Sequence, residues 1–125
     1  HIIYLGAKAD VRPCIQRADV VVLPSYREGT PRSLLEAAAM AKPLLATDVA
    51  GCREVVKSKK NGLLCEVKNA QDLAKKMIEM IEMPQEVLKE MGKESRLLAE
   101  NVFDEKNVFY HYEEAIRVLL AKKRK

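Results

Sequence analysis

The sequence predicts a three-layer α/β domain, in which a parallel sheet lies between helices and is followed by further helices. Two observations predict it: short apolar runs alternate with amphipathic stretches over residues 1–69, and helical periodicity alone fills residues 70–125. The chain has 125 residues, of which 48% are apolar and 32% charged, as in one soluble domain. We therefore expect residues 1–125 to form a single domain, with strand–helix units over 1–69 and a helical flank over 70–125.

Four apolar runs are the candidate strands. Every position in each run is apolar, rather than every second position, and this pattern indicates strands that are buried on both faces, as in a parallel sheet. Turn-forming residues such as glycine, proline and asparagine lie next to the runs. The four runs cover residues 2–5, 20–23, 44–46 and 63–65.

Three short helices are expected between the strands. The first covers residues 10–18. The second, over 31–41, is the best marked, with Thr30 as its candidate N-cap, Pro31 at the first helical position and an alanine-rich stretch behind them. A further helical turn is expected over 52–57.

Three amphipathic helices are expected in the second half of the chain. Each repeats apolar residues every three or four positions, which places them on one helix face. Pro84 begins the second helix, and Asp104 is the candidate cap of the third. The expected apolar faces are Leu73, Met77, Ile78 and Ile81 over residues 70–83, then Leu88, Met91, Leu98 and Val102, and finally Val108, Tyr112, Ile116 and Leu120.

The net charge of +4 comes from one end of the chain. There are 22 basic and 18 acidic residues, and the four last residues, Lys122, Lys123, Arg124 and Lys125, account for the whole excess. A basic cluster at a terminus is most often a solvated tail. Because the chain also has no tryptophan and only 5% aromatic residues, we expect no nucleic-acid partner.

Cysteine usage argues against a disulfide framework and against a metal site. Cys14, Cys52 and Cys65 are an odd number, with no C-x-x-C spacing and no nearby histidine. This pattern favours reduced thiols that pack as small apolar side chains, and hence a cytoplasmic location. No D-x-D pair is present to carry Mg²⁺ or Mn²⁺. We therefore expect neither a metal nor another cofactor.

The stretch from Glu28 to Glu36 is the candidate functional site. It joins the second candidate strand to the best-marked helix, at the sheet edge where strand carboxyl ends meet helix N-termini. Gly29 lets a ligand approach the backbone, and free N–H groups of the first turn, from neighbours such as Arg32 and Ser33, suit a phosphate. Glu36 would accept two hydrogen bonds from the vicinal hydroxyls of a ribose. The structural alternative is that Glu28 complements the helix dipole and that Glu36 is simply solvated.

A resemblance to a known family is carried by residues 18–56, ADVVVLPSYREGTPRSLLEAAAMAKPLLATDVAGCREVV. This stretch resembles the C-terminal, nucleotide-sugar-binding half of the retaining glycosyltransferases of family 4, which have the GT-B architecture. Glu28 and Glu36 match the family's E-x7-E motif, with Pro-Ser before it and Leu-Glu-Ala, Lys-Pro, Ala-Thr-Asp and Glu-Val-Val after it. The likeness extends more loosely over residues 3–73. It implies a Rossmann-like fold, and it is most similar to bacterial transferases that build polysaccharides and lipid-linked glycans.

The resemblance also implies roles for the site residues. Glu36 would hold the ribose hydroxyls, and Glu28 would be the catalytic residue that contacts the donor sugar near the reacting centre. The parent enzyme would transfer a hexose or N-acetylhexosamine from a nucleotide diphosphate sugar to a glycan or lipid-linked acceptor, with retention. Preorganised hydrogen-bond donors, and not a metal, would meet the charge on the leaving phosphate. The residues expected to approach the diphosphate and the sugar are Gly29, Thr30, Pro31, Arg32 and Ser33.

The same resemblance implies that these 125 residues belong to a larger enzyme. The family's N-terminal acceptor domain, and the first strand–helix unit of its donor domain, have no counterpart here. We therefore expect the chain by itself not to transfer sugar. The parent protein is expected in the cytoplasm, including the inner face of the cell membrane. Peripheral membrane contact, and a homodimer formed through an exposed strand edge, stay open.

Two alternatives belong to other functional classes. A nucleotide-sugar 2-epimerase shares the GT-B architecture but needs a histidine to remove a proton, and His1 and His111 stand at opposite ends of the chain. A non-enzymatic, receiver-like module needs an acidic cluster after its first strand, where this chain has Gly6-Ala7-Lys8.

Overall fold

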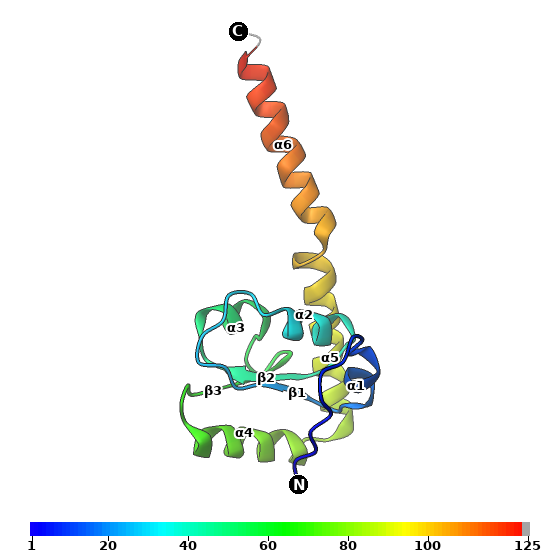
Figure 1. The fold of residues 1–125 in the computed structure, drawn as a ribbon, viewed down its shortest axis with the longest axis vertical. Coiled ribbons are helices and arrows are strands. Elements are labelled where there is room, and N and C mark those ends of the chain that lie inside the picture. The colour runs from blue at the N-terminus through cyan, green and yellow to red at the C-terminus, as the bar shows by residue number, and fades with distance from the viewer. Residues whose placement is uncertain (124–125) are drawn as a thin grey trace.

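The computed structural model describes residues 1–123 and shows the α/β fold that the sequence predicts (Figure 1). Arg124 and Lys125, which complete the basic cluster, lie outside the described residues. Within the described part, no helix combines the length and the apolar composition needed to cross a bilayer. In chain order, the elements are α1 (Arg12–Arg17), β1 (Val21–Leu23), α2 (Arg32–Ala39), β2 (Leu44–Thr47), α3 (Ala50–Val55), β3 (Gly62–Cys65), α4 (Ala70–Glu82), α5 (Gln85–Val102) and α6 (Glu105–Lys123).

The sheet has three parallel strands in the order β1-β2-β3. In its register, Leu45 of β2 pairs with Val22 of β1 and with Leu63 of β3. Every residue of β2 is buried, as the apolar run over 44–46 predicts, because helices cover both faces of this central strand. Strand β1 pairs only with β2 within residues 1–123, so its other edge is open.

Helices cover the two faces of the sheet as separate layers, with α2 and α3 on one face and α4 on the other (Figure 1). On the α2–α3 face, one apolar cluster includes Leu34, Leu44 and Val55. On the α4 face, a second cluster includes Leu45 and Met80. Successive residues of β2 thus contribute to opposite clusters, as the two-residue period of a strand requires.

Helix α5 contributes to both apolar clusters. Leu88 and Met91, in its first half, pack into the cluster on the α4 face, whereas Ala99 and Phe103, at its other end, pack against the cluster on the α2–α3 face. The sequence predicted the positions of Leu88 and Met91 on an apolar face, and both are buried. Helix α5 therefore fixes the two layers relative to each other.

Residues 2–5 do not form the expected strand. They have no regular secondary structure, and the side chains of Ile2 and Tyr4 are 100% and 90% exposed. A parallel strand needs a neighbour that supplies backbone hydrogen bonds, and no strand of residues 1–123 pairs with this segment. The prediction was wrong because an apolar run indicates only that a segment is suited to the interior of a sheet. It does not indicate that a neighbouring strand is present to pair with it.

The predicted apolar face of α4 is only partly buried. Leu73 is half-buried, whereas Met77, Ile78 and Ile81 are exposed. The buried residue of this helix is Met80, which the predicted face did not include. Met77 and Ile81 line a pocket of about 390 Å³ on the α4 face of the sheet, to which Val22 of β1 also contributes. Because the sheet stops at β1, no strand–helix unit within residues 1–123 covers these side chains.

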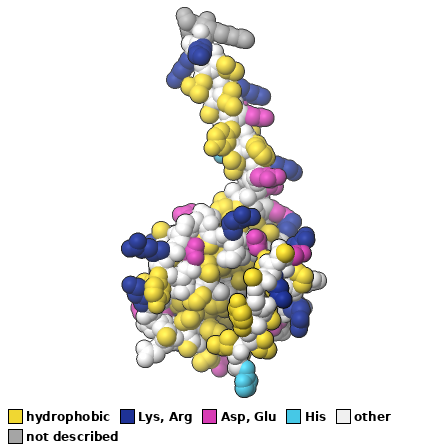
Figure 2. Space-filling view, viewed as in Figure 1, with side chains coloured by type: hydrophobic (Ala, Val, Ile, Leu, Met, Phe, Trp, Pro, Cys, Tyr) yellow, Lys and Arg dark blue, Asp and Glu magenta, His cyan; other side chains and the backbone are white. Residues whose placement is uncertain are grey.

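Helix α6 stands out from the rest of the domain (Figure 1). Asp104 begins it as predicted, because its Oδ1 accepts a hydrogen bond from the backbone N–H of Lys106 at 2.9 Å. No residue of α6 is buried, and apolar side chains lie open along it (Figure 2). The helix is present as predicted, but its apolar face has no packing partner within residues 1–123; that face comprises Val108, Tyr112, Ile116 and Leu120.

We expect the amide hydrogens of α6 to exchange with solvent roughly 100-fold or more faster than those of β2 in the 125-residue chain. A helix without tertiary packing is only marginally stable in water, and α6 buries no residue. Hydrogen exchange followed by NMR would measure both elements in one sample, with β2 as the internal reference. Equal protection of α6 and β2 would contradict the expectation.

Candidate functional site

The loops at the carboxyl edge of the sheet carry the predicted site residues. Residues 24–31 follow β1, residues 48–49 follow β2 and residues 66–69 follow β3. Because the strands are parallel, these loops leave the sheet at one edge. The N–H of Asp48 donates to the carbonyl of Cys65 at 2.7 Å, which ties the second loop to the end of β3. Glu28 and the start of α2 therefore lie at the edge where α/β proteins commonly bind ligands.

Helix α2 begins one residue later than expected. Pro31 has an extended backbone, with φ −75° and ψ 118°, and is the N-cap, so the prediction of Thr30 as the cap was wrong. The proline ring fixes φ but leaves ψ free to be extended, which moves the first helical residue to Arg32. No side chain caps this helix end. The N–H groups of Arg32, Ser33 and Leu34 thus have no partner inside the helix and are available to an anion.

Glu28 is half-buried and held by a neighbouring hydroxyl. The hydroxyl of Ser25 donates to Oε1 of Glu28 at 2.6 Å. The hydroxyl of Thr47 in turn donates to the carbonyl oxygen of Ser25 at 2.5 Å, and Thr47 is buried at the end of β2. The sequence pattern by itself predicted no role for Ser25 or Thr47. The available signal was that each hydroxyl residue stands at the carboxyl end of an apolar strand.

The loop that carries Glu28 rests on the first turn of α3. A Cβ atom at Gly51 would lie 1.5 Å from the carbonyl oxygen of Gly29 and 2.4 Å from that of Glu28. No residue larger than glycine fits at Gly51 without a shift of the backbone. At Gly29, by contrast, a Cβ would meet nothing within 4 Å, so the space beside Gly29 is open. The sequence predicts an approach of a ligand to the backbone at Gly29, and it did not single out the contact at Gly51.

Glu36 lies on the exposed face of α2. It follows Arg32 by four residues and Ser33 by three, so the three side chains share one side of the helix. Among residues 1–123, no hydrogen bond or ion pair involves the Glu36 carboxylate. It lines a shallow pocket of about 350 Å³ between α2 and α5. Arg96, across this pocket, pairs with Glu100 at 2.6 Å and donates to the last carbonyl of α2.

Cys52 is a buried thiol beside Thr47 and Glu28. Burial is the main cause that raises its pKa above the ordinary value; a hydrogen bond with Thr47 lowers the pKa, and the charge of Glu28 raises it further. Burial also raises the pKa of Cys65. Both thiols are therefore protonated and neutral at physiological pH. All three cysteines, Cys14 included, are free, as their number and spacing predicted.

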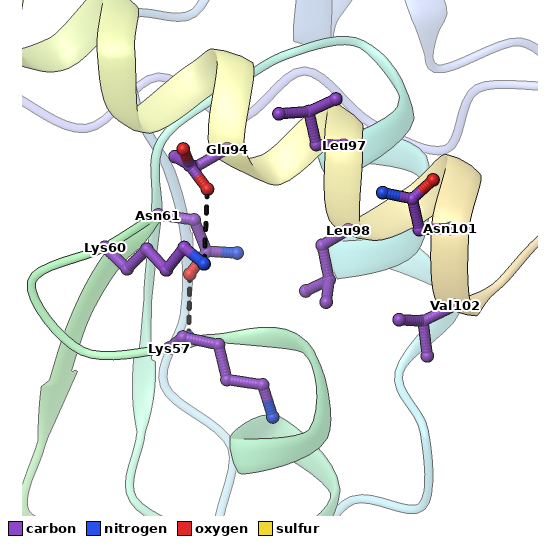
Figure 3. Close-up of a pocket in the computed structure, with 8 residues that line it drawn as sticks. All are labelled: Lys57, Lys60, Asn61, Glu94, Leu97, Leu98, Asn101 and Val102. Atoms are coloured by element: carbon purple, nitrogen blue, oxygen red, sulfur yellow. Dashed lines mark hydrogen bonds and ion pairs between the residues drawn. The ribbon is translucent and has the colours of Figure 1, made fainter.

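A separate pocket lies at the opposite edge of the sheet (Figure 3). Lys57, Lys60 and Asn61 line it on one side, and α5 contributes leucine and valine side chains on the other. The ammonium group of Lys60 lies 3.5 Å from the carboxylate of Glu94. Because Asn61 immediately precedes β3, this pocket of about 230 Å³ lies at the amino edge. It does not belong to the site built around Glu28.

Comparison with known proteins supports the resemblance found in the sequence. Residues 1–98 match the model of the family described as glycosyl transferases group 1. The chain is 43% identical over 79 residues to N,N'-diacetylbacillosaminyl-diphospho-undecaprenol alpha-1,3-N-acetylgalactosaminyltransferase of Campylobacter jejuni, a match that covers 63% of this chain. It is 33% identical over 99 residues to the putative glycosyltransferase EpsD of Bacillus subtilis, which covers 79% of this chain.

A solved structure with the same fold is that of Anabaena HepE in complex with UDP. The two superpose with a TM-score of 0.84 and 25% identity over 91% of this chain. The matched part is a minor part of each of these proteins: 21% of the Campylobacter relative, 26% of EpsD and 31% of HepE. The chain thus spans less than a third of the length of these relatives.

Proposed function

The chain belongs to the family of group 1 glycosyl transferases and has the fold of a GT-B glycosyltransferase C-terminal domain; we propose that it binds the nucleotide-sugar donor of a retaining, family 4 enzyme. One observation carries the proposal. Helix α2 starts directly after the loop that holds Glu28, and it presents Glu36 without a protein partner among residues 1–123, one turn beyond its free N–H groups. The family match favours this function over the 2-epimerase and the receiver-like module.

The proposed donor site has three parts. The diphosphate binds at the N-terminus of α2, where the N–H groups of Arg32 and Ser33 are free and the space beside Gly29 is open. Glu36 accepts hydrogen bonds from the ribose hydroxyls, and Glu28 contacts the sugar. The N–H groups at the start of α2, without a metal, stabilise the negative charge that builds up on the departing phosphate.

The relatives suggest the class of donor and acceptor. HepE has been solved with UDP and with UDP-glucose, so UDP-sugars are the first donors to try. The name of the Campylobacter relative specifies an acceptor linked to undecaprenol through a diphosphate. We accordingly propose that the parent protein transfers a hexose or N-acetylhexosamine to a lipid-linked glycan, with retention of configuration.

Replacing Glu36 by Ala in the parent-length protein is expected to weaken the binding of UDP roughly 10- to 100-fold. The substitution removes a carboxylate that accepts two charge-assisted hydrogen bonds from the ribose. Isothermal titration calorimetry with UDP measures the effect, and parallel titrations with GDP and ADP identify the preferred base.

Glu82→Ala is the matched control, because Glu82 is also an exposed helical glutamate, on α4 at the other face of the sheet. UDP affinity that is the same for the native protein and Glu36→Ala would show that the ribose assignment is wrong.

A further inference from the structure

Two hydroxyl groups connect the buried end of β2 to the carboxylate of Glu28. The Thr47 hydroxyl donates to the Ser25 carbonyl at 2.5 Å, and the Ser25 hydroxyl donates to Oε1 of Glu28 at 2.6 Å. Thr47 is 3% exposed and belongs to a strand that is buried along its whole length. The chain of hydrogen bonds therefore starts at a rigid point of the domain and ends at a loop side chain.

This arrangement restrains a side chain that would otherwise be mobile. A glutamate has three rotatable side-chain bonds, and a loop does not hold them in one rotamer without contacts. In the described residues, Ser25 is the one side chain that forms a hydrogen bond with Glu28, and no ion pair involves this carboxylate. Oε1 is thus engaged by the protein, and Oε2 stays available to another hydrogen-bond donor.

The backbone below Glu28 is restrained from a second direction. Gly51 supports the carbonyl oxygens of Glu28 and Gly29, where even a Cβ atom would overlap them. The neighbouring Cys52 thiol is fully buried, so it adds no exposed charged group beside the carboxylate. The backbone of Glu28 is held by α3, and its side chain is held by Ser25.

We propose that Ser25 and Thr47 are positioning residues, which hold the Glu28 carboxylate in the rotamer that it needs to meet the donor sugar. The proposal rests on the proposed function, because it takes Glu28 to be the residue that contacts the sugar. Ser25 acts through Glu28, and Thr47 acts through the backbone of Ser25. Neither residue needs to touch the donor.

The test compares Ser25→Ala with Ser25→Thr in the parent-length protein. We expect Ser25→Ala to lower kcat about 10-fold, because a hydrogen bond to a charged group is lost, while KM and the affinity for UDP stay within about twofold. Ser25→Thr keeps the hydroxyl and should restore most of kcat. The measurement is UDP release from whichever of UDP-glucose, UDP-galactose and UDP-N-acetylgalactosamine the native protein turns over fastest.

Thr47 is tested in the same way, with Thr47→Ser as the variant that keeps the hydroxyl and Thr47→Val as the one that removes it. Ser58→Ala is the control, because Ser58 is exposed at the amino edge of β3 and should leave kcat and the thermal midpoint unchanged. Native kcat in Ser25→Ala would overturn the proposal. The proposal would also be overturned if Ser25→Thr were no more active than Ser25→Ala. Turnover would then not depend on the hydroxyl, and the role of Ser25 would be merely structural.

Failure of this inference is distinguishable from failure of the proposed function. Suppose that the native protein releases UDP, that Glu28→Gln releases none, and that Ser25→Ala releases it at the native rate. The proposed donor site is then supported, and the positioning role of Ser25 is contradicted. If no UDP-sugar is turned over, the proposed function is contradicted. Crystal structures of the native and Ser25→Ala proteins then test the positioning role of Ser25 independently. An unchanged Glu28 rotamer in Ser25→Ala overturns the positioning role, and a displaced carboxylate supports it.

Discussion

Replacing Glu28 by Gln in the parent-length protein is expected to lower the turnover of its nucleotide sugar about 100- to 1,000-fold. The transition state of glycosyl transfer carries oxocarbenium-ion character, and a carboxylate next to the sugar stabilises this charge whereas an amide of the same shape does not. The Ser25 hydrogen bond at 2.6 Å holds the carboxylate in a fixed place before the donor binds. The stabilisation therefore needs little reorganisation during the reaction.

Binding and turnover should separate in this variant. UDP lacks the sugar, so its affinity for Glu28→Gln should stay within about threefold of the native value, whereas kcat falls. Glu54→Gln is the matched control, because Glu54 is an exposed glutamate on α3 outside the proposed donor site. A variant that loses UDP affinity but keeps kcat would place Glu28 at the nucleotide instead of the sugar.

Replacing Gly51 by Ala is expected to have the second large effect, on stability and on turnover together. The new Cβ would lie 1.5 Å from the carbonyl oxygen of Gly29, so the loop or the start of α3 must move. Overpacking of this kind costs about 1–3 kcal/mol, which corresponds to a fall of several degrees in the thermal midpoint. Because the displaced loop carries Glu28, we also expect turnover to fall roughly 10-fold or more.

Gly29→Ala is the folding control for this prediction. A Cβ at Gly29 meets no atom within 4 Å, so its thermal midpoint should stay within about 1 °C of the native value. Differential scanning fluorimetry measures both variants side by side. If Gly51→Ala had the native thermal midpoint, the loop could move without loss of stability, and Gly51 would not support Glu28.

The sequence predicted much of the fold because the relevant signals are local. The run over 44–46 is uniformly apolar, and it forms the central strand β2. The helix over 70–83 has its N-cap at Asn69, whose side chain accepts a hydrogen bond from the N–H of Asp72 at 2.9 Å. Strand and helix signals of this kind depend on residues only a few positions apart, so they can be recognised without the tertiary fold.

The same signals failed where the outcome depends on distant partners. The run over 2–5 is as apolar as β2, yet it forms no strand because no neighbouring strand pairs with it. Ile81 has the periodicity of a core residue but is 77% exposed, because the sheet ends at β1. The apolar face of α6 is exposed because no other element of residues 1–123 packs against it. Periodicity identifies apolar side chains, whereas burial depends on what packs against them.

For the candidate site, the sequence by itself determined the residue types, their order and the family. Glu28, Gly29 and Glu36 could be singled out because the motif around them lies in one continuous stretch. Only the tertiary structure showed that Thr47 holds Ser25 and that Gly51 supports the loop. These contacts join residues about twenty positions apart, and they exist because parallel strands β1 and β2 bring their carboxyl ends to the same edge of the sheet.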